Sequence, residues 1–165
     1  MASNNVAIPP HIQAFWDAYL RSGLAPLDAS ERFLESFSIG ANSDDAAAGA
    51  KEIVTGRKTA TSSLLWEIEA EDLPMPYVGA LSVLEDGASN PVCVVESTWV
   101  EVLSYGDVDA DFARDYGETD GTLDDWRRVF SPYYQYACSQ LGRTFSDQTP
   151  LVCERFAVRF LLSGD

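Results

Sequence analysis

The sequence predicts an α+β domain whose small, mixed and mostly antiparallel sheet curls into a β-barrel with flanking helices. Three observations lead to this prediction. Runs rich in β-branched residues dominate the second half of the chain, helical apolar spacing occurs before and between them, and the chain holds no internal repeat. With 165 residues, of which 46% are hydrophobic, the chain can bury one core without disulfides or metals. We therefore expect a single domain.

The first half of the chain is predicted to be largely helical. Apolar residues at helical spacing predict an amphipathic helix over residues 10–21. A second helix is expected over residues 44–55, with Ser43 as its N-cap and Gly56 just after its end. The stretch between these helices, residues 22–42, has no regular period and is expected to be irregular.

The strands are predicted mainly in the second half. A hydroxyl-rich strand is expected over residues 58–66, and longer strands over residues 77–85, 91–103 and 151–162. The second and third of these four strands are separated by the turn-forming sequence "DGASN", which predicts a hairpin.

Helical material is expected between the last two strands. Residues 108–116 form one short segment, and Thr122 with Asp125 forms a capping box that starts a longer helix. Gly142 is expected to end that helix.

The chain is strongly acidic, with 11 Lys and Arg against 26 Asp and Glu, a net charge of -15 and a pI near 4.2. Its long-range field repels polyanions, which excludes broad, charge-driven binding to nucleic acid. The charge is uneven, because residues 85–125 hold twelve acids and one base, whereas residues 126–159 hold five arginines and two acids.

The remaining composition favours a protein without cofactor, metal or membrane anchor. Three cysteines, an odd number without CxxC spacing, favour a reduced compartment. The single histidine, His11, has no cluster of metal ligands beside it. The first residues lack the basic and apolar regions of a signal peptide, and no apolar run approaches eighteen residues. We expect a cytoplasmic protein.

Lys58, in the stretch "GRKTATSS", is the first candidate for chemistry. A lysine becomes a nucleophile or proton shuttle when burial or a cationic neighbour such as Arg57 lowers its pKa. The alternative, which composition alone favours, is an exposed lysine that follows a helix end.

The hydroxyl side chains after Lys58 are a weaker signal. In a regular strand Thr61 and Ser63 point to one face and Lys58 to the other, so Lys58 and Thr61 share a site only if the chain bends between them. The alternative is that these residues simply form a strand.

Two acids in "YGETDGTLDDW" lie in the turn between the two later helices, where functional carboxylates are common. Glu118 is a candidate general acid or base, and Asp120 a candidate binding group. Their alternatives are a solvated surface acid and a charge at a helix N-terminus, respectively.

The basic and aromatic candidates are Arg127, Arg128 and Arg155, which can bind phosphate or carboxylate, and Trp66, whose ring can stack on a base. Pairing with surplus acids is the alternative for the arginines, and a place in the core is the alternative for the tryptophan. Arg155 and Glu154 are neighbours in the last strand and are therefore expected on opposite faces.

Three stretches together resemble the ASCH domain family, the activating-signal-cointegrator homology family of the PUA-like superfamily, and specifically its YhfF-like branch. They are "GRKTATSSLLWEIEAEDLPMPYVGALSVLEDG", "VVESTWVEVLSYGDVDADFARDYGETDGTLDDWRR" and "LVCERFAVRF". The resemblance implies a PUA-like barrel as the domain core at about residues 48–160, with residues 1–42 as an N-terminal helical extension packed on it.

The resemblance also implies a site. Some small bacterial members are amidohydrolases of N4-acetylcytidine and related nucleosides, and use a lysine and a threonine of a GxKxxT motif with a later glutamate. By motif these fall on Lys58, Thr61 and Glu118. YhfF-like proteins often carry a histidine where this chain has Phe130.

Three functions follow as hypotheses. The first is an amidohydrolase of an acylated nucleoside with Lys58, Thr61 and Glu118 as catalytic residues. The second is a module that binds short single-stranded RNA through its arginines, with or without ribonuclease activity. The third is a nucleotide sensor without catalysis. The substrate-binding residues expected for this pocket are Arg57, Ser63, Trp66, Asp120, Arg127, Arg128 and Arg155.

Overall fold

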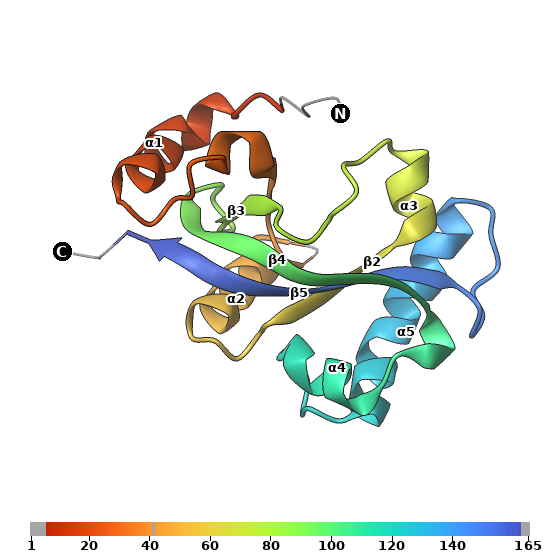
Figure 1. The fold of residues 1–165 in the computed structure, drawn as a ribbon. Helices are drawn as coiled ribbons and strands as arrows, with labels where there is room; N and C mark the ends of the chain where they lie inside the picture. The colour runs from red at the N-terminus through yellow and green to blue at the C-terminus, as the bar shows by residue number, and fades with distance from the viewer. Residues whose placement is uncertain (1–5, 41, 163–165) are drawn as a thin grey trace.

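The fold is built on one mixed sheet of five strands in the order β1-β3-β4-β5-β2 (Figure 1). It is seen in a computed structural model that describes residues 6–40 and 42–162. The strands are β1 (Phe33–Phe37), β2 (Ala60–Leu64), β3 (Leu81–Glu85), β4 (Pro91–Ser104) and β5 (Pro150–Leu161). β1 runs parallel to β3, and the other three pairings are antiparallel.

The predicted α+β fold with a mixed sheet and flanking helices is confirmed, but the sheet is open and does not close into the expected barrel. β1 and β2 are its two edges and do not pair with each other. β2 ends after five residues, since the chain turns directly into a helix at Leu65, and β1 is equally short. The long central pair, β4 and β5, is strongly twisted (Figure 1) and carries the rest of the sheet.

The helices flank this sheet. They are α1 (Gln13–Arg21), α2 (Ser43–Val54), α3 (Leu65–Ala70), α4 (Ala110–Tyr116) and α5 (Leu123–Gln140), with short 3-10 turns at Pro10–Ile12, Ala29–Arg32 and Tyr105–Asp107. All four longer helical segments were predicted: α1 and α5 from apolar spacing, α2 from its terminal residues, and α4 as a short segment before α5. The expected capping box is also confirmed, since the Thr122 side chain accepts a hydrogen bond from the Asp125 amide.

Three local predictions were wrong. The N-cap of α2 is Asn42, whose side chain accepts from the Asp45 amide, whereas Ser43 is already helical. The strand expected over residues 58–66 is shorter, because Lys58 precedes β2 and the last two residues belong to α3. The stretch expected to be irregular contains β1. The N-terminal segment therefore contributes a strand to the sheet as well as a helix.

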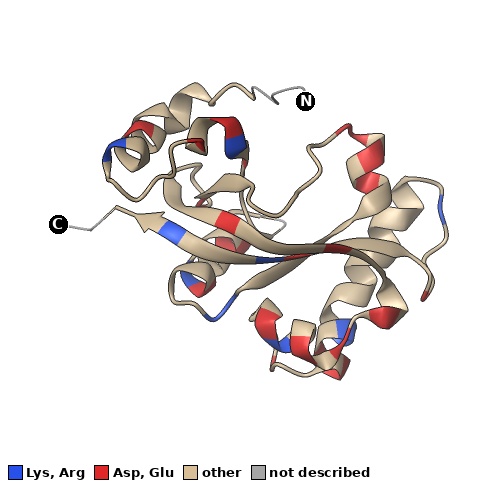
Figure 2. Cartoon of the chain, in the orientation of Figure 1, with Lys and Arg blue, Asp and Glu red and all other residues tan. Residues whose placement is uncertain are grey.

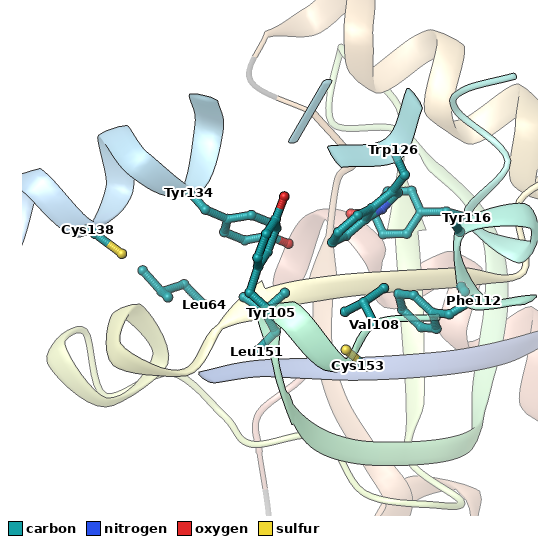
Figure 3. Packing of buried hydrophobic residues seen from close by; sticks show 12 residues of the cluster. Leu64, Tyr105, Val108, Phe112, Tyr116, Trp126, Tyr134, Cys138, Leu151 and Cys153 are labelled. Carbon is teal, nitrogen blue, oxygen red and sulfur yellow. The ribbon is translucent and has the colours of Figure 1, made fainter. Parts of the chain in front are cut away.

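Two apolar clusters pack helices on opposite ends of the sheet. At one end Trp16 and Tyr19 of α1 pack against Phe33 and Phe160. At the other end, Figure 3 shows the aromatic side chains of α4 and α5, including Trp126 and Tyr116, gathered over β2 and β5. A third cluster holds α2 against β3, β4 and β5. Burial of these large side chains holds α1, α2, α4 and α5 against the sheet.

Candidate functional site

A cavity of about 840 Å³ lies between α2, the α4–α5 connection, α5 and one face of the sheet. Its floor comes from all five strands, because paired residues share a face: Glu35 pairs with Ser82, and Ser82 with Val95. At the other side of the floor Thr61 pairs with Glu154. Polar residues of neighbouring strands thus lie side by side on the sheet face that forms the cavity floor.

Lys58 is buried beside this cavity, with 1% of its surface exposed. It lies before β2, and its backbone amide donates to the carbonyl of Glu52 at the end of α2 (3.0 Å). Its ammonium donates to the carbonyls of Ala60 (2.8 Å) and Tyr116 (3.1 Å) and to Oε2 of Glu118 (3.0 Å). All three donors of the ammonium are therefore satisfied.

The environment of Lys58 favours its neutral form more than water does. Burial lowers the pKa of Lys58 to about 8, although the carboxylate of Glu118 acts in the opposite direction. The ammonium also lies 3.6 Å from the centroid of the Tyr116 ring. Roughly a tenth of the molecules carry a free amine at pH 7 if the pKa is 8, so this lysine can both accept and return a proton near neutral pH.

Gly117 makes the Lys58–Glu118 contact possible. Its backbone is left-handed, with φ of 72°, and a Cβ there would lie 2.3 Å from the Arg57 carbonyl oxygen and 2.7 Å from the Lys58 Cα. Only glycine allows the turn after α4 to approach the "GRK" segment so closely. Gly117 is thus a positioning residue for Glu118.

Thr61 and Glu118 both line the cavity, as does Ser63. Within the described residues no hydrogen bond joins Lys58 directly to Thr61; Glu118 connects the lysine to the cavity. Since Lys58 precedes the regular strand, the alternation that would separate it from Thr61 does not apply to it.

Behind Thr61, hydroxyl groups connect the strand to the helices. Ser62 donates to the Tyr116 hydroxyl (3.3 Å) and is also bonded to the Tyr134 hydroxyl. Burial raises the pKa of the Tyr116 hydroxyl to about 12, so this hydroxyl stays protonated at physiological pH. These contacts fix β2 against α4 and α5.

Glu35 and Glu154 are cavity residues that the sequence interpretation missed. Burial raises the pKa of the Glu35 carboxyl to about 7, and the charge of Glu154 adds to the effect. Burial also raises the pKa of Glu154, although a hydrogen bond from Ser97 (3.2 Å) opposes this. One signal was available: each acid stands within a short apolar run, "FLESF" or "LVCERF".

The cavity is acidic. Its lining carries the carboxylates of Glu35, Asp45, Glu52, Glu118 and Glu154, and no Lys or Arg among residues 6–40 and 42–162 lines it. Figure 2 shows that basic residues are sparse and scattered over the fold, whereas acidic ones recur on helices and strands. The cavity is therefore suited to neutral or cationic ligands rather than to phosphates.

Three of the expected binding arginines are held in ion pairs. Arg57 is 64% exposed and pairs with Glu52 at 2.7 Å, and Arg128 pairs with Asp125. Arg155 pairs with Asp115 at 3.0 Å on the opposite face of the sheet from Glu154. That opposite placement was predicted, and it directs Arg155 away from the cavity.

Three of the four remaining expected binding residues also lie outside the cavity lining. Arg127 donates to the carbonyl of Gly106 (3.3 Å), and Trp66 stacks under Arg143, with 4.5 Å between guanidinium and ring centroid. Asp120 accepts from the backbone and hydroxyl of Thr122 and so supports the start of α5. Of the residues expected to bind substrate, Ser63 alone lines the cavity.

Phe130 lines the cavity from α5. Its ring centroid is 4.7 Å from that of Tyr116, the residue that also covers Lys58. An apolar ring at this position shields the lysine side of the cavity.

The open mixed sheet, its flanking helices and the cavity on one face of the sheet define an α+β domain. Comparison with protein families matches the ASCH domain over residues 35–159. The chain belongs to the ASCH domain family.

Solved structures agree with this assignment. The crystal structure of an ASCH domain from Lactobacillus crispatus JV V101 is similar, with 30% identity, a TM-score of 0.81, and coverage of 92% of this chain and 96% of that one. A protein from Enterococcus faecalis V583 shares the fold at 24% identity and a TM-score of 0.78, with coverage of 94% and 96%. No curated protein matches the chain.

Two further features concern the chain as a whole. All three cysteines, Cys93, Cys138 and Cys153, are buried and unpaired. In the described part of the chain, no helix has the length and apolar character needed to span a membrane.

Proposed function

We propose that the chain is an amidohydrolase that acts on a small, neutral acylated nucleoside such as N4-acetylcytidine. The observation that carries the proposal is the buried Lys58, whose ammonium contacts Glu118 at the wall of a cavity that Thr61 also lines. A lysine with a pKa near 8, linked to a carboxylate, suits proton transfer at neutral pH.

The proposed reaction moves one proton in and one proton out. The carboxylate of Glu118, which lines the cavity, takes the proton of the nucleophile, either the Thr61 hydroxyl or a water molecule beside it, and passes it to the neutral amine of Lys58 as the new bond forms to the acyl carbon. Glu118 then relays that proton from Lys58 to the leaving nitrogen, and the C–N bond breaks. With water as the nucleophile these steps give the free amine and the carboxylic acid; with Thr61 as the nucleophile, one water molecule then hydrolyses the acyl-threonine to the carboxylic acid and restores the hydroxyl.

The charge of the cavity supports a neutral substrate. RNA binding through this cavity would bring phosphates against five carboxylates, at a cost that salt screens only partly. Arg57, Arg128 and Arg155, which would contact phosphates in an RNA-binding module, are engaged in ion pairs. RNA binding and the sensor role are therefore alternatives that the test below addresses.

The test compares wild type, Lys58→Met and Lys51→Met, with mass spectrometry of the products from N4-acetylcytidine. Lys51 is exposed on α2, so its replacement makes the same chemical change away from the cavity. We expect the wild type to release cytidine and acetate, Lys58→Met to lose at least about a thousandfold in kcat/KM, and Lys51→Met to retain activity.

The proposal fails if the wild type leaves N4-acetylcytidine intact or if Lys58→Met is as active as Lys51→Met. A second arm uses a short single-stranded RNA. Lysine-dependent cleavage would favour a ribonuclease, and binding of cytidine without turnover of either substrate would favour the sensor. Circular dichroism shows whether Lys58→Met is folded, which is expected because a methionine fits a buried site.

A further inference from the structure

Three polar side chains form a strip on the cavity floor, away from Lys58. Glu35 of β1 is the cross-strand partner of Ser82 of β3. Ser97 of β4 lies on the same face and donates to Glu154 of β5 at 3.2 Å. The strip Glu35–Ser82–Glu154 thus spans the centre of the sheet.

Two members of this strip have side-chain oxygens open to the cavity. Ser82 is 6% exposed, as is Ser97, yet only Ser97 makes a side-chain hydrogen bond within the described residues. Glu35 has no ion pair or side-chain hydrogen bond in the same part of the chain, and it lines the cavity. Their oxygens are not among the fully buried polar atoms that lack a partner, so the open cavity reaches them and a ligand can hydrogen-bond to them there.

The chemistry of the strip selects among ligands. An ionised carboxylate only accepts hydrogen bonds, and a serine hydroxyl can donate and accept. Vicinal hydroxyls, such as those of ribose, offer two donors at once. A phosphate offers no donor when fully ionised, and brings a like charge.

We propose that Glu35, Ser82 and Glu154 bind the ribose hydroxyls of the ligand, so that the cavity accepts a free ribonucleoside and rejects its phosphorylated form. The identity of the ligand as a nucleoside rests on the proposed function. The strip restricts which nucleosides bind: it favours those that carry both vicinal hydroxyls of ribose and no phosphate group. It also places sugar recognition next to the acyl chemistry, because Glu154 is the cross-strand partner of Thr61.

The ionisation of Glu35 makes the selection depend on pH. Because burial raises the pKa of Glu35 to about 7, this carboxyl is largely protonated at pH 6 and largely ionised at pH 8. Rejection of phosphate is therefore stronger at pH 8.

The test measures dissociation constants by calorimetry at pH 8 for cytidine, 2′-deoxycytidine and cytidine 5′-monophosphate. The wild type should bind cytidine at least about tenfold more tightly than either of the others. In Glu154→Gln the ratio of the dissociation constant of cytidine 5′-monophosphate to that of cytidine should fall by about tenfold, because one of the two like charges on the strip is removed. In Ser82→Ala, which removes one hydroxyl, the ratio of the dissociation constant of 2′-deoxycytidine to that of cytidine should fall.

The matched control is Glu101→Gln on β4, an exposed acid outside the cavity, which changes the net charge equally and should leave all three constants unchanged. The inference is overturned if the wild type binds the monophosphate as tightly as cytidine, binds none of the three, or is affected as much by Glu101→Gln as by Glu154→Gln. Binding preference without hydrolysis of N4-acetylcytidine would refute only the proposed function, and hydrolysis without preference only this inference.

Discussion

Glu154 and Arg155 are adjacent in β5, yet they lie in two different environments. On one face the Arg155 guanidinium pairs with Asp115 and stacks on Trp99, 4.7 Å from the ring centroid. On the other face Glu154 meets a cavity that no described cation lines, and its one side-chain hydrogen bond comes from Ser97.

This difference indicates that the face of Arg155 stabilises the fold and that the face of Glu154 is available to a ligand. The charge of Arg155 is compensated by an acid and covered by aromatic rings, which is typical of a residue that stabilises the fold. The charge of Glu154 is only partly compensated and costs stability on burial, which is typical of a residue kept for a ligand. Replacing residues of the packed face should therefore change stability, whereas replacing residues of the cavity face should change activity.

The largest effect is expected at the residue that joins the two faces. Gly117 separates Asp115 on the packed face from Glu118 on the cavity face. Gly117→Ala should lower the free energy of unfolding by about 2–4 kcal/mol, because the left-handed φ is strained and the Cβ meets the backbone of residues 57 and 58. It should also lower hydrolysis of N4-acetylcytidine, since Glu118 moves away from Lys58.

The control for this change is Gly142→Ala, after α5. Gly142 has a φ of 66°, but no atom lies within 4 Å of its added Cβ. It should lose only about 1 kcal/mol and keep full activity. Urea unfolding and initial rates measure both variants; equal losses in the two would refute the close approach at Gly117.

A smaller effect should distinguish the two faces directly. Arg155→Met should lower the free energy of unfolding by about 2 kcal/mol, since Asp115 loses its partner and the rings lose a stacked cation. The kcat/KM of the folded fraction should stay unchanged. Glu154→Gln should show the reverse pattern, with the free energy of unfolding retained or raised, because a buried charge is removed, and with ligand binding altered. A loss of activity in Arg155→Met would contradict this division.

The last effect concerns the pH dependence of stability and arises from one carboxyl. The pKa of Glu35 is about 7 in the folded chain against 4.5 as its ordinary value, so the folded state holds this proton more tightly than the unfolded state. Its contribution is fully present below pH 4.5 and is lost as pH rises to 7.

Glu35→Gln removes that loss. The variant should match the wild type near pH 4.5 and exceed its free energy of unfolding by about 3 kcal/mol at pH 8 in urea unfolding. A variant with the same pH profile as the wild type would show that Glu35 ionises as freely as a surface acid.

Local signals predicted much of the fold. The helices α1 and α5 have clear apolar spacing, Gly56 identifies the end of α2, the Thr122 capping box identifies a helix start, and the β3–β4 hairpin has a short turn sequence. β1 was missed because its partner β3 is parallel and lies far along the chain, so no turn connects them. Closure into a barrel was wrong because strand length and edge pairing depend on tertiary contacts.

The site was predicted less completely. Lys58, Thr61 and Glu118 came from family resemblance, and their proximity depends on a left-handed turn at Gly117. Glu35 and Glu154 could not be distinguished from the other acids of a chain with net charge -15, because the residue type alone does not show whether a side chain is buried. Arg127 and Arg128 were expected at the pocket, but their positions on α5 direct them to Gly106 and Asp125.

The parallel pairing of β1 has a consequence for folding and for protein production. β1 can join the sheet only after β3, about fifty residues later, has formed, so the N-terminal segment docks late. A shortened protein that begins after β1 would leave the edge of β3 open to pairing with other chains, and would aggregate. The N-terminal segment thus protects the sheet from self-association while it supplies Glu35.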